Sequence, residues 1–179
     1  YTLWINNSEK WEKFPKREII CASGNRAFEH GTDNVYIVFP FDNSRIGVCP
    51  EDDIWDSFED LADMVSDANE LNMFISEIMG EYNMDWKEFE KQAKSLNSQD
   101  VDEGNLSILN DWQGRGGTLY EYLDHLLDPK RNNFKLYPIS KYQVTYRDNK
   151  EVWTDSKCIL LNYDFEQSHT IIEFLTRKL

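Results

Sequence analysis

Cysteine, basic residues and long apolar runs are all scarce in this sequence. The 179 residues include three cysteines, Cys21, Cys49 and Cys158, which lie far apart in apolar runs. Their odd number and spacing favour buried free thiols in a reducing compartment over a disulfide framework. No apolar run reaches the ~18 residues that a bilayer span needs, and no basic segment followed by an apolar one marks a signal peptide. We therefore expect a cytoplasmic protein without a membrane span.

The shortage of bases leaves 19 Lys and Arg against 33 Asp and Glu, a net charge of −14. Such a balance argues against direct binding to nucleic acid or to an anionic membrane. It leaves open a basic pocket or a cationic protein partner. The chain is 40% hydrophobic and 14% aromatic, which excludes a disordered class and predicts one domain over residues 1–179.

The negative charge is concentrated in residues 51–103, which hold 17 acids and 3 bases, while the other residues hold 16 of each. The chain is therefore a neutral frame with an acidic insert. Two interpretations stay open for these acids. They form a solvated helix face, or they present carboxylates to a basic surface.

Helical periodicity appears in the same part of the chain. Apolar residues recur at three- and four-residue steps between Asp53 and Gly80, with Asp53 as the N-cap. A second helix is expected after Asp85, and Thr118 with Glu121 forms the capping box of a third. The pattern predicts a helical acidic insertion over residues 53–127.

Short apolar runs on both sides of the insertion predict strands. They are residues 18–22, 35–39, 46–49, 134–137, 142–146, 152–153 and 158–161. A closing helix is expected over 168–178. The order of elements predicts an α+β fold, in which a mostly antiparallel sheet core is interrupted by the acidic helices. We expect five strand residues to be buried in that core: Val35, Ile37, Phe39, Ile159 and Leu161.

Neither a Cys-x-x-Cys motif nor a histidine pair at helical spacing is present, so we expect no metal site. The glycine-rich segment 114–117, with Arg115, precedes the helix capped by Thr118. Backbone N–H groups of glycines can approach an anion, so this segment is an anion-binding loop or a connector between helices.

Two strand ends carry groups suited to nucleotide chemistry. The run 15–23 is a strand that ends in Ala22 and Ser23, and Glu151 begins the later strand of residues 150–155. A Ser at a strand edge can position a Glu on a neighbouring strand. The Glu can then stabilise the oxocarbenium-like charge that builds on a ribose when nicotinamide leaves.

These segments resemble the mono-ADP-ribosyltransferases of the Arg–Ser–Glu type, including toxin-like members carried by bacteria and phages. Ala22 and Ser23 correspond to the Ser motif, residues 36–40 to the core strand that ends in Pro, and Glu151 to the catalytic Glu. The resemblance covers residues 17–50 and 132–161.

The resemblance implies NAD as the cofactor, with Glu151 as the catalytic residue. Ser23 would hold Glu151 and the nicotinamide ribose, and Asn149 occupies the polar position two residues before Glu151. The diphosphate would be held by Arg17, or by Arg26 or Arg147. Because the sequence begins with Tyr1 rather than Met, the alternative that the family's Arg strand precedes Tyr1 also stays open.

Two functions from different classes follow. The first is NAD-dependent transfer of ADP-ribose to a macromolecular target. The alternative is a non-catalytic acidic binding or inhibitor protein, in the manner of a nucleic-acid mimic, that docks on a basic partner through residues 51–103.

Overall fold

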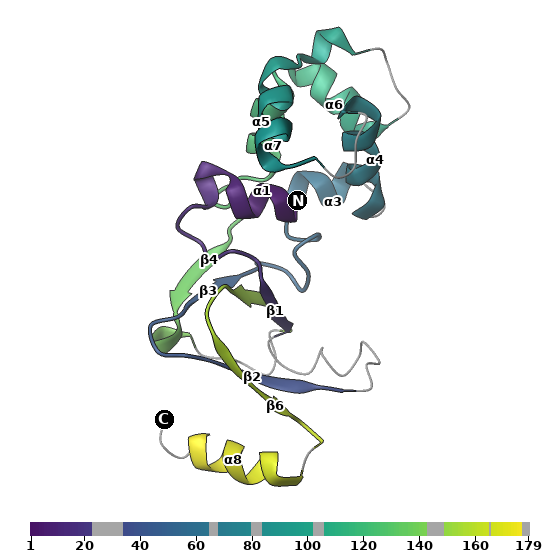
Figure 1. Ribbon diagram of the computed structural model, residues 1–179. Helices are drawn as coiled ribbons and strands as arrows, with labels where there is room; N and C mark the ends of the chain where they lie inside the picture. Colours follow the sequence, from purple (N-terminus) through teal and green to yellow (C-terminus); the bar gives the residue numbers. More distant parts are fainter. Residues whose placement is uncertain are drawn as a thin grey trace. The chain divides into compact units, whose positions relative to one another are not determined.

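The computed structural model divides the chain into two compact units (Figure 1). It describes residues 1–22, 34–64, 68–79, 84–101, 106–142, 149–164 and 166–176. The first unit comprises residues 1–13 and 53–134, and the second comprises residues 14–52 and 135–179. The first is helical and the second carries antiparallel strands, so the predicted α+β class is confirmed.

The first unit contains the expected insertion 53–127 and also takes in the start of the chain. Its described helices and 3-10 turns are α1 (Thr2–Asn7), η1 (Glu9–Trp11), α3 (Glu59–Met64), α4 (Ala68–Met79), α5 (Trp86–Ser95), η2 (Ser98–Asp100), α6 (Ser107–Arg115) and α7 (Leu119–Leu126).

Two predicted helix starts are confirmed. The side chain of Asp85 accepts the N–H of Glu88 at 2.9 Å and caps α5. At the start of α7, the side chains of Thr118 and Glu121 each accept the other residue's backbone N–H, which completes the capping box. Both caps are local patterns of a few residues, which is why the sequence alone reveals them.

The predicted helix from Asp53 to Gly80 is wrong at its start. Residues 53–58 form turns, and the first described helix of this stretch, α3, begins at Glu59. The carboxylate of Asp53 accepts the N–H of Trp55, and the carbonyl of Asp53 accepts the hydroxyl of Ser57. Local hydrogen bonds of this kind stabilise a turn at Asp53. They compete with the hydrogen bonds that Asp53 would make as the N-cap of a helix.

Two helices, α1 and α6, were not expected. Trp4 and Ile5 of α1 are buried against the helical unit, and α6 buries Ile108, Leu109 and Trp112 at helical spacing. Both helices are short, so their apolar periodicity extends over too few residues to stand out in the sequence.

Aromatic side chains form the centre of the first unit. Trp11 packs edge-to-face against Phe134, with ring centroids 5.0 Å apart, and Phe58 lies 5.1 Å from Phe134. The indole nitrogen of Trp11 donates to the carbonyl of Leu127 at 2.8 Å. The start of the chain and the residues at the end of the helical unit therefore share one hydrophobic core. Burial of these large aromatic side chains contributes much of the stability of such a core.

The described residues of the second unit form two antiparallel sheets instead of the single sheet expected. A four-stranded sheet has the order β1-β5-β3-β4, and a two-stranded sheet pairs β2 with β6. The strands are β1 (Ile19–Ala22), β2 (Tyr36–Pro40), β3 (Arg45–Val48), β4 (Lys135–Pro138), β5 (Glu151–Thr154) and β6 (Cys158–Asn162), followed by α8 (Glu166–Thr176); η3 (Ile139–Lys141) follows β4.

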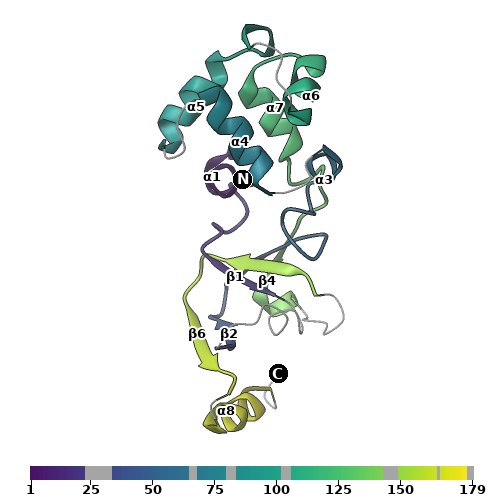
Figure 2. The ribbon, with the colours of Figure 1, turned by 90° about the vertical axis from the view of Figure 1, so that its right-hand side faces the viewer.

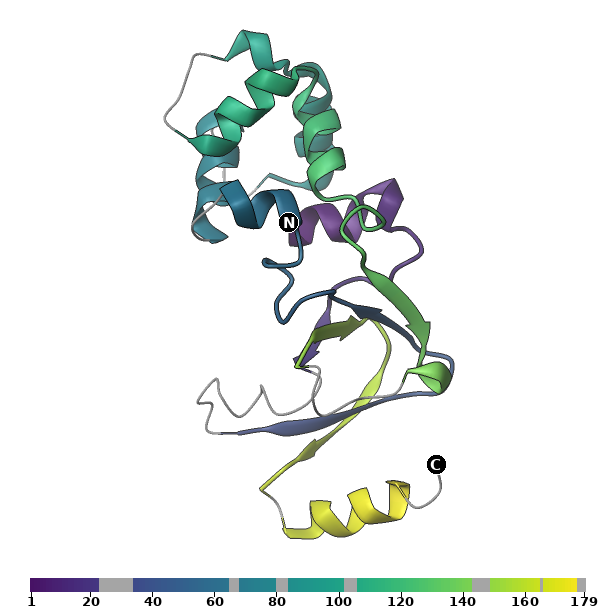
Figure 3. The same cartoon turned by 180° about the vertical axis from the view of Figure 1, so that it is seen from behind.

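The two sheets are joined by two continuous chain segments. Residues 36–48 run antiparallel to residues 152–162, and their pairing is interrupted between β2 and β3 and between β5 and β6 (Figure 3). The carbonyl of Arg45 accepts the hydroxyl of Thr154 at 2.9 Å within this interruption. The predicted strand 142–146 falls mostly outside the described residues, as do Gly80 and the end of the predicted closing helix.

The predicted core of the second unit is partly wrong. Ile159 is 48% exposed, and Val35, Ile37, Phe39 and Leu161 are only half-buried. The apolar residues that are buried instead lie on the four-stranded sheet or directly after one of its strands: Ile46, Val48, Cys49 and Trp153. An apolar strand is buried on both faces only where other elements pack against both faces. The composition of the strand does not show whether such elements are present.

All three cysteines are free, as predicted. Cys49 is buried, whereas Cys21 and Cys158 are half-buried. Burial, together with the nearby Cys158 thiol, raises the pKa of Cys21 to about 11. Cys21 is therefore protonated and unreactive at neutral pH, since the thiolate is the nucleophilic form.

Candidate functional site

A largely buried ion pair in the second unit joins two residues predicted for the nucleotide site. Nη2 of Arg17 donates to Oε1 of Glu151 at 2.7 Å, and Nε of Arg17 donates to the same oxygen at 3.1 Å. The two side chains are only 8% and 12% exposed. The residues are 134 positions apart in the sequence, so this contact depends on the fold of the whole unit.

Backbone contacts hold both partners in place. The N–H of Glu151 donates to the carbonyl of Asp52, and the carbonyl of Glu151 accepts the N–H of Cys49. The segment before Arg17 is fixed along β5, because the indole nitrogen of Trp153 donates to the carbonyl of Pro15 at 2.9 Å. A rigid frame of this kind lowers the entropic cost of holding two long side chains in one geometry.

Ala22 lies opposite Glu151 in the register of β1 and β5. The strand end that precedes Ser23 is thus brought to Glu151, as the sequence suggested. Ser23 itself lies outside the described residues, and so do Arg26 and Arg147.

Asn149, the fourth predicted cofactor-binding residue, adopts a left-handed backbone with φ of 36°. Its Oδ1 is buried and accepts no hydrogen bond within the described part of the chain. A non-glycine residue rarely adopts this conformation, which costs of order 1 kcal/mol. Local strain and an unmet acceptor therefore occur two residues before Glu151.

The structure places the guanidinium of Arg17 against Glu151. Its Nε and Nη2 groups donate to Glu151, so a nucleotide diphosphate would have to displace that carboxylate to bind them. In the described geometry, Arg17 positions the carboxylate of Glu151 and forms an ion pair with it. Removing Arg17 would leave this mostly buried carboxylate without its cation.

The glycine-rich segment in the first unit is a helix connector in the structure. Arg115 ends α6, and its Nε donates to Asp111 at 2.7 Å, while its Nη2 lies 3.4 Å from Asp60. Gly116 and Gly117 adopt φ of 74° and 82°, which reverses the chain between α6 and α7. Two carboxylates oppose the guanidinium, so the arrangement gives no support to an anion-binding loop.

Arg115 belongs to a larger network of charges in the helical unit. Arg131 donates to Asp60 at 2.7 Å, and this hydrogen bond is the main cause that lowers the pKa of the Asp60 carboxyl. Tyr122 donates from its hydroxyl to Asp111 at 2.9 Å, and burial raises the pKa of Tyr122. The network ties α3, α6, α7 and the segment after α7 together.

The charge of the protein is divided unequally between the two units. The helical unit carries 21 acids and 8 bases, a formal charge of −13, and the second unit carries 12 acids and 11 bases, a formal charge of −1. Four of the bases in the helical unit are already paired with carboxylates inside it: Lys10, Lys94, Arg115 and Arg131. The remaining acids therefore dominate its surface.

Several acids on that surface are exposed. Asp56, Glu59 and Glu77 are exposed and have no ion pair among the described residues. Asp60 differs from them, since it is bound by two arginines inside the unit. It is thus not part of a free acidic face, although the sequence grouped it with its neighbours.

The described residues contain no group of three or more His, Cys, Asp and Glu side chains that could hold a metal ion. No helix in the described ranges is long and apolar enough to cross a membrane. No family model, curated protein or solved structure matches the chain.

Proposed function

We propose that the protein is a binding module whose helical unit docks on a basic surface of a partner protein. The observation that carries the proposal is the unequal division of charge: one compact unit has a formal charge of −13, whereas the second unit is nearly neutral. Like charges held on one compact unit repel one another and lower its stability. A role in binding would explain why the protein keeps these acids although they lower its stability.

Electrostatic docking has a recognisable signature. Long-range attraction speeds encounter and weakens as salt screens charges beyond ~8–10 Å. A partner that normally binds nucleic acid presents the matching basic surface. The acidic unit would compete with the phosphate backbone for that surface.

The test measures binding to a set of purified DNA-binding proteins in the presence and absence of duplex DNA. We expect affinity to fall with added salt, duplex DNA to compete, and Glu59→Lys with Glu77→Lys to weaken binding about tenfold or more. Asp42→Lys is the matched control, since Asp42 is an exposed acid of the nearly neutral unit. Binding that is insensitive to salt and to the charge reversals would contradict the proposal.

A second candidate function is NAD-dependent ADP-ribosyl transfer. It is favoured by the convergence of Arg17 and Glu151 and by the register that brings Ala22 to Glu151. In this reaction the bond between nicotinamide and the ribose C1 carbon breaks, nicotinamide leaves with the electron pair, and a nucleophile on the target bonds to C1. Glu151 would stabilise the positive charge on the ribose, with Arg17 positioning its carboxylate.

Nicotinamide release from NAD tests this candidate. Glu151→Gln is expected to lower the rate by ~10²–10³, the usual effect of losing one preorganised electrostatic contact. The comparison requires that the variant be folded, which circular dichroism checks. An intact protein that neither binds NAD by calorimetry nor releases nicotinamide would end this candidate and leave the binding module.

A further inference from the structure

We propose that a cavity between α1 and α4 seats one apolar anchor side chain of a basic partner segment. The inference rests on the proposed binding function of the helical unit and names the site where the partner is held. The inference is supported by an apolar cavity in the same unit that carries the excess of acids.

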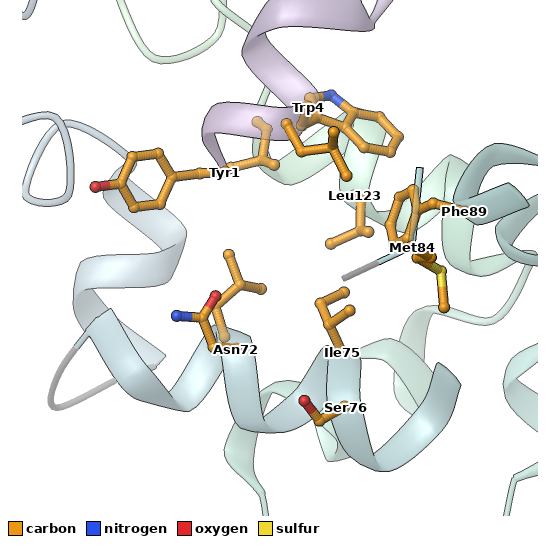
Figure 4. Close-up of a pocket in the computed structure, with 11 residues that line it drawn as sticks. Tyr1, Trp4, Asn72, Ile75, Ser76, Met84, Phe89 and Leu123 are labelled. Atoms are coloured by element: carbon orange, nitrogen blue, oxygen red, sulfur yellow. The ribbon is translucent and has the colours of Figure 1, made fainter. Parts of the chain in front are cut away.

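The cavity has a volume of about 140 Å³. Trp4 of α1 lies on one side, Asn72 and Ile75 of α4 lie on the other, and Leu123 and Phe89 lie beside them (Figure 4). Figure 2 shows α1 along its axis, next to α4. A cavity of about 150 Å³ with apolar walls accommodates a benzene-sized group, so this one fits a Phe ring or a branched aliphatic side chain.

The walls are mainly apolar, and five of the eleven lining residues are buried. Trp4, Leu71, Phe89 and Leu123 are between 2% and 5% exposed. The only buried polar side-chain atoms without a hydrogen bond in the described lining are Nε1 of Trp4 and Oγ of Ser76, and neither has appreciable solvent contact. A bound group could not reach them without moving the walls. The cavity therefore offers apolar contact, as an anchor residue requires.

The rim of the cavity is partly exposed, so a partner peptide can contact it while its anchor residue occupies the cavity. Leu3 is 41% exposed, and Met84 is half-buried at the edge. Methionine is flexible and polarisable, which suits surfaces that pack against different side chains. Two exposed acids adjoin the lining in the sequence: Glu77 follows Ser76 on α4, and Asp85 follows Met84.

The negative charge of the helical unit favours a basic peptide over a second copy of this chain as the occupant of the cavity. A second copy would bring another chain of charge −14 against a unit of charge −13, and this like-charge repulsion opposes self-association. A basic segment gains from the same field. A Lys- or Arg-rich stretch with one large apolar residue complements both the acids and the apolar walls.

A displayed library of random short peptides, selected on the full chain, tests the proposal. We expect the selected peptides to share one Phe, Leu or Ile flanked by Lys or Arg. Replacing that apolar residue by Ala in the tightest peptide should weaken binding at least about tenfold, as for an interface anchor.

Matched variants locate the peptide. Ile75→Phe fills the cavity and should weaken the selected peptide about tenfold, whereas Met73→Phe, on the same helix but outside the lining and 53% exposed, should not. Leu3→Ala, at the exposed rim, should weaken binding less and with little effect on folding. It keeps the test decisive if Ile75→Phe does not fold.

The outcomes separate this inference from the proposed function. Binding that falls with salt and with Glu77→Lys but ignores both Ile75→Phe and Leu3→Ala would overturn the anchor site alone. Selected peptides without Lys or Arg, bound with no dependence on salt, would overturn both. Self-association of the protein that Ile75→Phe abolishes would overturn the basic partner in favour of a second copy.

Discussion

Gly47 lies directly against the indole ring of Trp153, its register partner across β3 and β5. A Cβ added to Gly47 would overlap the Cε2 and Cζ2 atoms of that ring. Trp153 is 1% exposed and stacks on Phe14, so the ring has little room to move. The contact explains why this strand position carries no side chain.

Gly47→Ala is expected to destabilise the protein by about 2–3 kcal/mol, because overpacking a buried contact forces ring or backbone shifts. Chemical denaturation monitored by tryptophan fluorescence measures the change. Gly114→Ala is the control. Apart from its chain neighbours and the backbone of its own helix, no described atom lies within 4 Å of the added Cβ, and Ala favours the helical backbone of α6. Equal stability of the two variants would contradict the packing argument.

Arg17→Met should lower the free energy of unfolding by about 3–5 kcal/mol, because it leaves the carboxylate of Glu151 mostly buried without its partner. The double variant Arg17→Met with Glu151→Leu should recover much of the loss, since no buried charge remains. A double-mutant cycle in denaturant measures the coupling. Additive losses in the two single variants would show that the ion pair contributes little.

Asp60→Asn should reduce stability at neutral pH by about 1 kcal/mol, given that its partners are partly exposed. Because the folded state lowers the pKa of Asp60 below its ordinary value of 3.8, its stabilisation is present above that value and is lost as the pH falls further. Thermal melts at pH 7 and below pH 3.8 should show a smaller difference between wild type and variant in acid. Asp56→Asn, at an exposed position, serves as the control.

The thiol of Cys21 should resist alkylation by iodoacetamide at pH 8 in the native protein and become reactive as the pH approaches 11. The unfolded thiol deprotonates near pH 9, so stability from this group is present below pH 9 and is lost as the pH rises toward 11. Mass spectrometry of the alkylated peptide gives the rate. Rapid modification of Cys21 at pH 8 without unfolding would contradict the expected shift.

Local signals in the sequence predicted local features well. The caps at Asp85 and Thr118 depend on side chains within three residues of the backbone groups that they bind. The turn at Asp53 was predicted as a helix start, because the same carboxylate can cap a helix or close a turn. The pairing of a strand and the elements that cover its faces depend on residues far away in the chain. The exposure of Ile159 could therefore not be predicted from the apolar run 158–161.

The sequence named the residues of the candidate site but not the contacts between them. It placed Arg17 and Glu151 in one site, and the fold brings the two side chains together as an ion pair. Their roles toward a nucleotide stay a prediction. The cavity between α1 and α4 left no signal in the sequence. Its walls come from helices far apart in the chain, and Trp4 reads as an ordinary apolar residue until its neighbours are known.

By itself the sequence determined the charge of the protein, its α+β class and the free state of its cysteines, because composition and short patterns specify these properties. Only the tertiary structure decided which residues meet. It paired Arg17 with Glu151, pressed Gly47 against Trp153, and collected residues 1–13 and 53–134 into one acidic unit. Each of these depends on contacts between distant segments, whose energies arise from burial and packing that no local pattern encodes.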